Sequence, residues 1–278
     1  MTTPRDLYVQ GIHHKLDYFA TWLPGRTLTL GDFGPLVDGA LDYKGRLADQ
    51  HVAFDERVDR NPVDYSHTSD AGVRIDIKAA AATAAPAIKG KAAVHFAQRG
   101  AFVFHATGCV GHAIADQVDL EAQLRAAHEQ GRWDLDWVVV TEVVWAERAT
   151  ILIANSVGAQ VDLSVQGDLA AAVRNLASAE AGVALEAQSG DVTQVIAATG
   201  LTPLYRLARL KKRWFSSDVS LGTVRSAGVG PLEAATERGA WQPEPAAAPE
   251  VKLEPLTLAD LQPASAGAAA GSRGFGGG

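Results

Sequence analysis

Two patterns of hydrophobic and polar residues alternate along the first 215 residues. The clearest is in residues 72–78, where apolar and charged side chains alternate with a period of two, as in a strand with one buried face. Helical spacing predicts amphipathic helices at 5–18 and 116–130, the second ending at Gly131. Because tight turns rather than regular crossover helices join the strands, we expect an α+β fold with a twisted, mainly antiparallel central sheet and peripheral helices.

Other segments add strands to this picture. Near-continuous apolarity in residues 137–154, interrupted at Glu147 and Arg148, predicts a hairpin buried on both faces. The polar residues 49–69 indicate a loop, and residues 203–215 form another strand or a strand–helix junction. Further strands are expected at 92–96 and 101–106, around the turn or bulge of residues 98–100, and at 182–188 and 192–199, around the turn of residues 189–191. A separate strand is expected at 161–165.

The composition changes near Ser226. Residues 226–278 are rich in Ala, Pro and Gly, and they hold half of the 12 prolines, which remove backbone donors and fix φ. We therefore divide the chain into a folded body, 1–225, and a tail, 226–278, that is either a linker or a removable part. One apolar island, residues 251–261, interrupts the tail. Its leucines are Leu253, Leu256, Leu258 and Leu261.

Composition limits the function classes. The chain has 278 residues, of which 47% are hydrophobic and 21% charged, as expected of a globular protein. The net charge of −7 argues against a nucleic-acid binder. A single cysteine, Cys109, excludes an intrachain disulfide framework and fits a reducing compartment. We find neither a signal sequence nor an apolar run of about 20 residues, and we expect cytoplasmic synthesis.

No motif predicts catalysis. The eight histidines lack compact metal-ligand spacing, and the sequence has no nucleotide-binding glycine loop and no serine-hydrolase elbow. We therefore predict no enzymatic activity, no cofactor and no metal. The alternative is a soluble α+β ligand-binding or enzymatic domain with a disordered C-terminal linker, which would use His95, His105, Cys109 or His112.

A basic cluster with interleaved aromatic residues precedes the composition change. As a solvated edge strand it needs no function, whereas near an anionic membrane each basic residue would contribute about 1 kcal/mol. The candidate lipid contacts are Arg209, Lys211, Lys212, Arg213 and Trp214.

Taken in order, these segments resemble the pore-forming domain of gasdermins, and the short tail makes the bacterial gasdermins the closest comparison. The order of the segments together with the tail carries the resemblance, which covers most of residues 1–215. The segments are 7–47, which includes Trp22-Leu-Pro-Gly25 and Leu41-Asp-Tyr-Lys-Gly-Arg-Leu47, the strand region 73–106, Trp137-Val-Val-Val-Thr-Glu-Val-Val144, Ala159-Gln-Val-Asp-Leu163 and Thr202-Pro-Leu-Tyr-Arg-Leu-Ala-Arg-Leu210.

The resemblance implies a gasdermin-like body, 1–225, held inactive in the cytoplasm by the tail, with 251–261 as the autoinhibitory segment. An activating protease, often caspase-like, would remove the tail, and Glu237, Arg238 and Asp260 are candidate cleavage residues. The body would then contact membrane lipids, self-associate into a large ring in the cell inner membrane and cause cell death in antiphage defence.

The resemblance also implies two membrane-inserting β-hairpins per protomer, from about residues 72–106 and 161–199. The expected apolar positions of the first are Val73, Ile75, Ile77, Val94, Phe96, Phe102 and Phe104. Those of the second are Val161, Leu163, Val165, Val183, Leu185, Val192 and Ile196. Many bacterial gasdermins have an acylated cysteine near the N-terminus. Residues 2–5 contain none here, and we predict no acyl group at that position.

Overall fold

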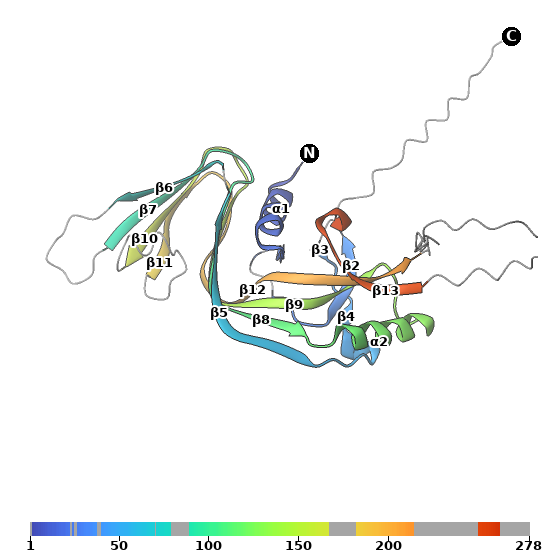
Figure 1. The fold of residues 1–278 in the computed structure, drawn as a ribbon. Coiled ribbons are helices and arrows are strands. Elements are labelled where there is room, and N and C mark those ends of the chain that lie inside the picture. Colours follow the sequence, from blue (N-terminus) through green and yellow to red (C-terminus); the bar gives the residue numbers. More distant parts are fainter. Residues whose placement is uncertain are drawn as a thin grey trace, which may run out of the picture.

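The computed structural model describes residues 2–22, 24, 27–37, 40–69, 71–78, 89–166, 182–213 and 250–261. Its elements are α1 (Pro4–Leu16), β1 (Phe19–Ala20), β2 (Asp32–Val37), β3 (Ala40–Leu41), β4 (Gly45–Arg46), the 3-10 helix η1 (Leu47–Gln50), β5 (Glu56–Thr68), β6 (Val73–Lys78), β7 (Lys89–Phe96), β8 (Phe102–Ile114), α2 (Gln117–Glu129), β9 (Trp137–Ala154), β10 (Ala159–Gln166), β11 (Gly182–Ser189), β12 (Val192–Arg213), β13 (Glu250–Pro255) and the 3-10 helix η2 (Leu258–Leu261). This mixture, dominated by antiparallel strands, confirms the broad α+β prediction (Figure 1).

Local sequence signals place both helices as predicted. Thr3 caps α1 in a capping box with Asp6, and Pro4 follows as the first helical residue. Asp116 caps α2, because its side chain accepts hydrogen bonds from the amides of residues 118 and 119. After α2 the chain turns at Gly131, whose φ of 70° lies in the left-handed region.

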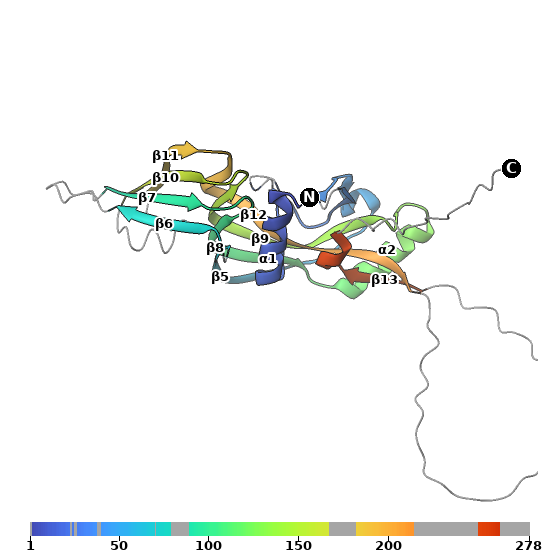
Figure 2. The ribbon, with the colours of Figure 1, turned by 90° about the horizontal axis from the view of Figure 1, so that it is seen from above.

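The strands form two sheets. The long sheet has the order β5-β8-β9-β12, with β1 and β13 on the outer side of β12 and β2 beside the start of β9. The short sheet has the order β6-β7-β10-β11. Seen from above, the short sheet lies at one end of the long sheet, away from α2 and β13 (Figure 2).

The short sheet repeats the strand order of the long sheet because its strands continue the long ones. β5 continues into β6, β7 into β8, β9 into β10 and β11 into β12, each through a corner of a few residues. Every corner contains one glycine in the left-handed region, which L side chains rarely adopt. These corner glycines are Gly72 (φ 88°), Gly100 (φ 81°), Gly158 (φ 74°) and Gly190 (φ 78°).

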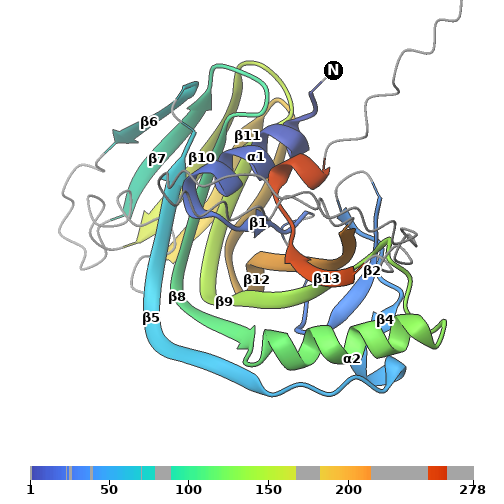
Figure 3. The same ribbon diagram turned by 45° about the vertical axis from the view of Figure 1, so that its right-hand side comes forward.

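The inner face of the long sheet packs on α1. Tyr8 and Ile12 of the helix are fully buried there together with Phe104 and Ile151 of the sheet. Figure 3 shows the long sheet curving around α1. We call this apolar cluster the inner core.

The opposite face of the same strands packs on the short sheet. Val94 and Leu163 of the short sheet share a cluster with Val103 and Leu152 of the long sheet, and we call it the outer core. A third cluster lies between α2 and the other end of the long sheet, and it includes Leu124; we call it the α2 core. Strand β9 is therefore buried on both faces, as its continuous apolarity predicted.

Two local predictions were wrong. β9 runs unbroken through Glu147 and Arg148, because these residues supply no turn chemistry and Arg148 pairs with both β8 and β12. Residues 56–68 of the predicted loop form β5, an exposed edge strand that needs no apolar face. The predicted turns at 98–100 and 189–191 are present as corners between the two sheets, since β7 pairs with β10 and β6, and β11 pairs with β10.

The burial of β9 on both faces predicts that neighbouring residues are equally sensitive to truncation. Ile151→Ala and Leu152→Ala, which face opposite cores, should each lower the free energy of unfolding by about 2–5 kcal/mol. Val118→Ala, on an exposed position of α2, should change it by less than about 0.5 kcal/mol. Chemical denaturation measures all three, and a small effect of only one β9 variant would contradict the two-sided packing.

Candidate functional site

The outer side of β12 is covered by the last part of the chain that the structure describes. β12 pairs with β9 along one side, while β1 and β13 cover its other side. Residues 208–213 pair in antiparallel register with residues 250–255. The amide of Leu256 then donates to the carbonyl of Leu207 at 2.9 Å. The island of the tail therefore adds a strand to the edge of the long sheet, which would otherwise expose unpaired backbone groups.

Apolar side chains of the island contact the body on both faces of this edge. Val251 and Leu253 are partly buried against the α2 core. Leu256 is buried in the inner core, with 6% of its surface exposed. Leu258 and Leu261 are the first and last residues of η2, and Leu258 is half-buried. A fully buried leucine contributes about 1.5–3 kcal/mol, so Leu256 is the main apolar anchor of the segment.

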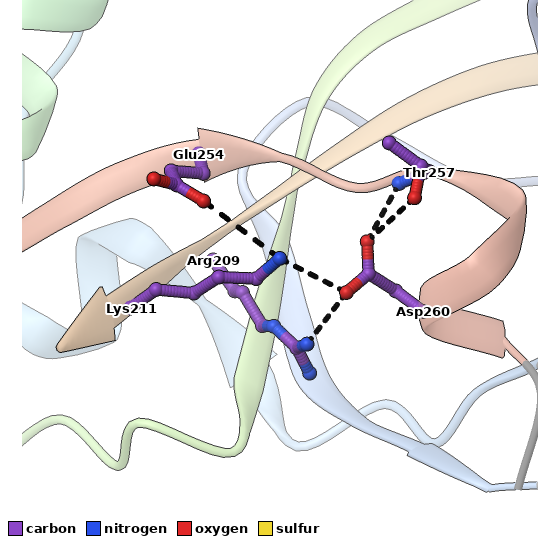
Figure 4. Close-up of polar contacts among 5 residues, drawn as sticks. All are labelled: Arg209, Lys211, Glu254, Thr257 and Asp260. Atoms are coloured by element: carbon purple, nitrogen blue, oxygen red, sulfur yellow. Dashed lines mark hydrogen bonds and ion pairs between the residues drawn. The ribbon is translucent and has the colours of Figure 1, made fainter. Parts of the chain in front are cut away.

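A carboxylate joins the segment to two basic residues of β12 (Figure 4). Oδ1 of Asp260 accepts hydrogen bonds from Nη2 of Arg209 at 2.7 Å and from Nζ of Lys211 at 2.9 Å. Oδ2 accepts from the amide and the hydroxyl of Thr257, both at 2.9 Å. Glu254 lies 3.7 Å from Nζ of Lys211. We call Asp260 with Arg209, Lys211 and Thr257 the Asp260 latch.

The surroundings of Asp260 favour its charged form. Burial alone would raise the pKa of this carboxyl, whose side chain is only 12% exposed. Hydrogen bonds from Thr257 and Lys211, together with the positive charge of Lys211, outweigh burial and lower the pKa to about 2. At neutral pH the latch therefore holds a carboxylate between two cations, a stronger arrangement than an exposed ion pair.

The candidate lipid contacts on β12 all lie in the part of the strand that pairs with β13. They are Arg209, Lys211, Lys212 and Arg213, of which Arg209 and Lys211 are also bonded to Asp260. Trp214 lies outside the described residues, as do the candidate cleavage residues Glu237 and Arg238. Asp260 was also a candidate cleavage residue, but its burial in the latch makes it a poor protease target.

The predicted hairpin residues are distributed over both sheets. In the outer core the short sheet contributes Val73, Ile75, Val94, Phe96, Val161 and Leu163, while β12 contributes Val192 and Ile196. Phe102 and Phe104 of β8 instead belong to the inner core. Ile77, Val165 and Val183 lie on β6, β10 and β11, and Leu185 of β11 is 42% exposed. Each predicted hairpin thus includes a corner and part of the long sheet.

The alternative of a ligand-binding or enzymatic domain would use four residues that do not form one cluster: His95, His105, Cys109 and His112. His95 lies on the short sheet, 3.1 Å from a carboxylate oxygen of Asp76, while the other three are spread along β8. Burial, followed by the charge of Asp64, raises the pKa of the Cys109 thiol to about 12, so the thiol stays protonated at neutral pH. Within the described part of the chain, no group of three or more potential ligands could hold a metal ion.

The sequence matches no protein-family profile, and no curated protein is significantly similar to it. Among the residues that the structure describes, no helix is long and apolar enough to span a membrane.

Sequence reasoning did not identify the latch, although a local signal exists. Thr257 and Asp260 have the spacing of a capping box, Thr-x-x-Asp, at the start of a short helical turn. That pattern points to Thr257 as the partner of Asp260. It does not reveal Arg209 and Lys211, which are about 50 positions away in the sequence.

Removal of the charge at Asp260 should loosen the segment. Asp260→Asn retains the shape but weakens the hydrogen bonds to two cations, each worth about 1.5–3 kcal/mol. Hydrogen exchange at the amide of Leu256 should therefore accelerate by at least tenfold. Asp42→Asn, in an exposed ion pair with Lys44, serves as the control. Unchanged exchange in Asp260→Asn would contradict the latch.

The latch should also depend on pH in the acid range. Because the pKa of Asp260 is lower in the folded protein than in the unfolded chain, its contribution is complete above about pH 4 and is lost as the pH falls towards 2. The difference in Leu256 exchange between the natural protein and Asp260→Asn should therefore shrink from pH 5 to pH 2. A difference that stays constant over this range would show that Asp260 does not titrate in the latch.

Proposed function

We propose that the protein is an autoinhibited pore-forming effector of the gasdermin type. Cleavage between the body and residues 250–261 frees the edge of β12, the body self-associates into a ring, and two β-hairpins per protomer permeabilise the membrane. The inactive protein is cytoplasmic, the active form is in the cell inner membrane, and the outcome is cell death in antiphage defence. The resemblance alone supplies the protease, caspase-like or similar, the cellular locations and the role in antiphage defence.

One observation carries the proposal: each strand of the short sheet continues a strand of the long sheet in the same order. If the four corners straighten, β5–β6 and β7–β8 become one long hairpin. β9–β10 and β11–β12 become a second. The conversion needs no new strand order, since the pairs β6–β7 and β10–β11 already exist. The fold therefore supports two hairpins per protomer.

The two faces of the short sheet differ in the way that an inserted hairpin requires. Its outer-core face is apolar, and when the sheet extends this face would meet lipid. The other face carries ion pairs, with Arg74 2.7 Å from Asp76 and Lys91 2.6 Å from Glu186. Alternation of apolar and polar side chains is the pattern of strands that separate lipid from water.

The tail supports the autoinhibitory part of the proposal. It covers the edge of β12, which could otherwise pair with another chain. Its residue Asp260 also forms ion pairs with Arg209 and Lys211, two of the candidate lipid contacts. Loss of the tail would free a sheet edge for pairing with another protomer and two cations for contact with an anionic membrane.

A cleavable variant tests the proposal. A recognition sequence for a specific protease, placed between residues 228 and 249, allows the purified protein to be cut on demand. Cut protein should release dye from anionic liposomes and form rings in negative-stain images, whereas intact protein should do neither. Cut protein that stays monomeric and leaves liposomes sealed would disprove the function.

A reversible crosslink provides the matched control. The Cα atoms of Lys212 and Val251 are directly paired across β12 and β13, at a spacing that a disulfide can bridge. In the cleavable variant with Lys212→Cys and Val251→Cys, oxidised protein should remain inactive after cutting. Reduction should restore leakage, and this comparison separates release of the tail from the effect of the two substitutions.

A further inference from the structure

The four corners are joined by hydrogen bonds into one continuous seam. The amide of Ala97 donates to the carbonyl of Gly72 at 2.7 Å, which joins the first corner to the second. The amide of Gly100 donates to Ala154, at the start of the third corner, at 2.8 Å. The amide of Asn155 donates to Asp191, in the fourth corner, at 2.8 Å.

Side chains reinforce this seam. The hydroxyl of Ser69 accepts a hydrogen bond from the amide of Phe102 at 3.1 Å. The side-chain amide of Asn155 donates to the carboxylate of Asp191 at 3.1 Å. The backbone amide of Asp191 donates to the hydroxyl of Ser156 at 3.0 Å. Opening one corner alone would therefore leave donors and acceptors of its neighbours unpaired.

Helix α1 packs directly on the seam at the second corner. A Cβ atom at Gly100 would lie 2.2 Å from Cδ1 of Leu7, so the leucine side chain fills the space beside that glycine. A Cβ atom at Gly11 would lie 2.7 Å from Cε1 of Phe102, so the aromatic ring rests on the helix backbone. The ring of Tyr8 meets Phe102 edge-to-face, at 5.2 Å between centroids.

We infer that the four corners form a single cooperative hinge and that α1 holds this hinge closed through Leu7 at Gly100. The seam makes the corners open together, and the contacts of Leu7, Tyr8 and Gly11 with the second corner must break before the seam can open. This coupling is a property of the fold alone. Its role in membrane insertion rests on the proposed function.

The leucine of α1 provides the first test. Leu7 is 38% exposed, so Leu7→Ala removes the contact with Gly100 without emptying the core. Hydrogen exchange in the full chain should accelerate by about tenfold, and by a similar factor, at the amides of Ala97, Gly100 and Asn155. The amide of Leu120 in α2 should not change. Val118→Ala is the control for loss of an apolar side chain from an exposed helix position.

A second variant perturbs the hinge from a corner that α1 does not fill. Gly158 has a positive φ, and no atom lies within 4 Å of the position of its Cβ, so Gly158→Ala strains the backbone without a clash. It should accelerate exchange about tenfold at the amide of Ser69, which donates to Phe102 from the first corner, two corners away, as well as at Asn155. Gly131→Ala has the same backbone strain and the same open space, but it lies after α2 and serves as the control.

The outcomes separate the parts of the inference. Acceleration confined to the substituted corner would refute the cooperative hinge. Seam amides that do not respond to Leu7→Ala would refute the role of α1, and equal acceleration at Leu120 would reduce the effect to general destabilisation. Liposome leakage is measured separately. When the cleavable variant also carries Leu7→Ala, the cut protein should permeabilise liposomes several-fold faster than the cut protein without this substitution. If the exchange result holds but no variant leaks, the proposed function fails and the hinge remains.

Discussion

Strands β8 and β9 carry apolar side chains on both faces, so each face of the long sheet needs its own cover. α1 covers the inner face, and the outer face is covered by the same strands, which fold back as the short sheet. Folding back requires every strand to change direction at the same level of the sheet. The corner glycines, the seam of hydrogen bonds and the contact between Leu7 and Gly100 all follow from that requirement.

Local signals were sufficient for some elements. The spacing of apolar residues located both helices, whose starts Thr3 and Asp116 cap, and the apolarity of residues 137–154 indicated burial on both faces. Local signals could not show that the corners lie between two different sheets. A glycine turn between two strand-forming runs looks the same whether the runs pair with each other or enter different sheets, because that choice depends on distant strands. β5 was missed because an edge strand with two wet faces has the composition of a loop.

The candidate site, too, could be predicted only in part from the sequence. The leucines of 251–261 marked an apolar segment, and the structure places Leu253 and Leu256 against the body. The basic residues 209 and 211 were interpreted as lipid contacts, yet in this state both are bonded to Asp260. Opposite charges about 50 positions apart cannot be paired from one sequence, since only the register of β12 with β13 brings them together. In the proposed function, these cations become available to a membrane only when that strand is released.

In the proposed mechanism, the register of β13 also separates the connection that is cut from the segment that restrains the body. Arg213 lies directly opposite Glu250, and a turn of two residues would be enough to join strands in this register, although residues 214–249 separate them in the sequence. The length and sequence of this connection therefore place no demand on the pairing that follows it. Under the proposed function, recognition sequences for unrelated proteases could be exchanged within it while the latch and the buried leucine stay the same. In the proposed mechanism, one body could in this way be adapted to different activating proteases.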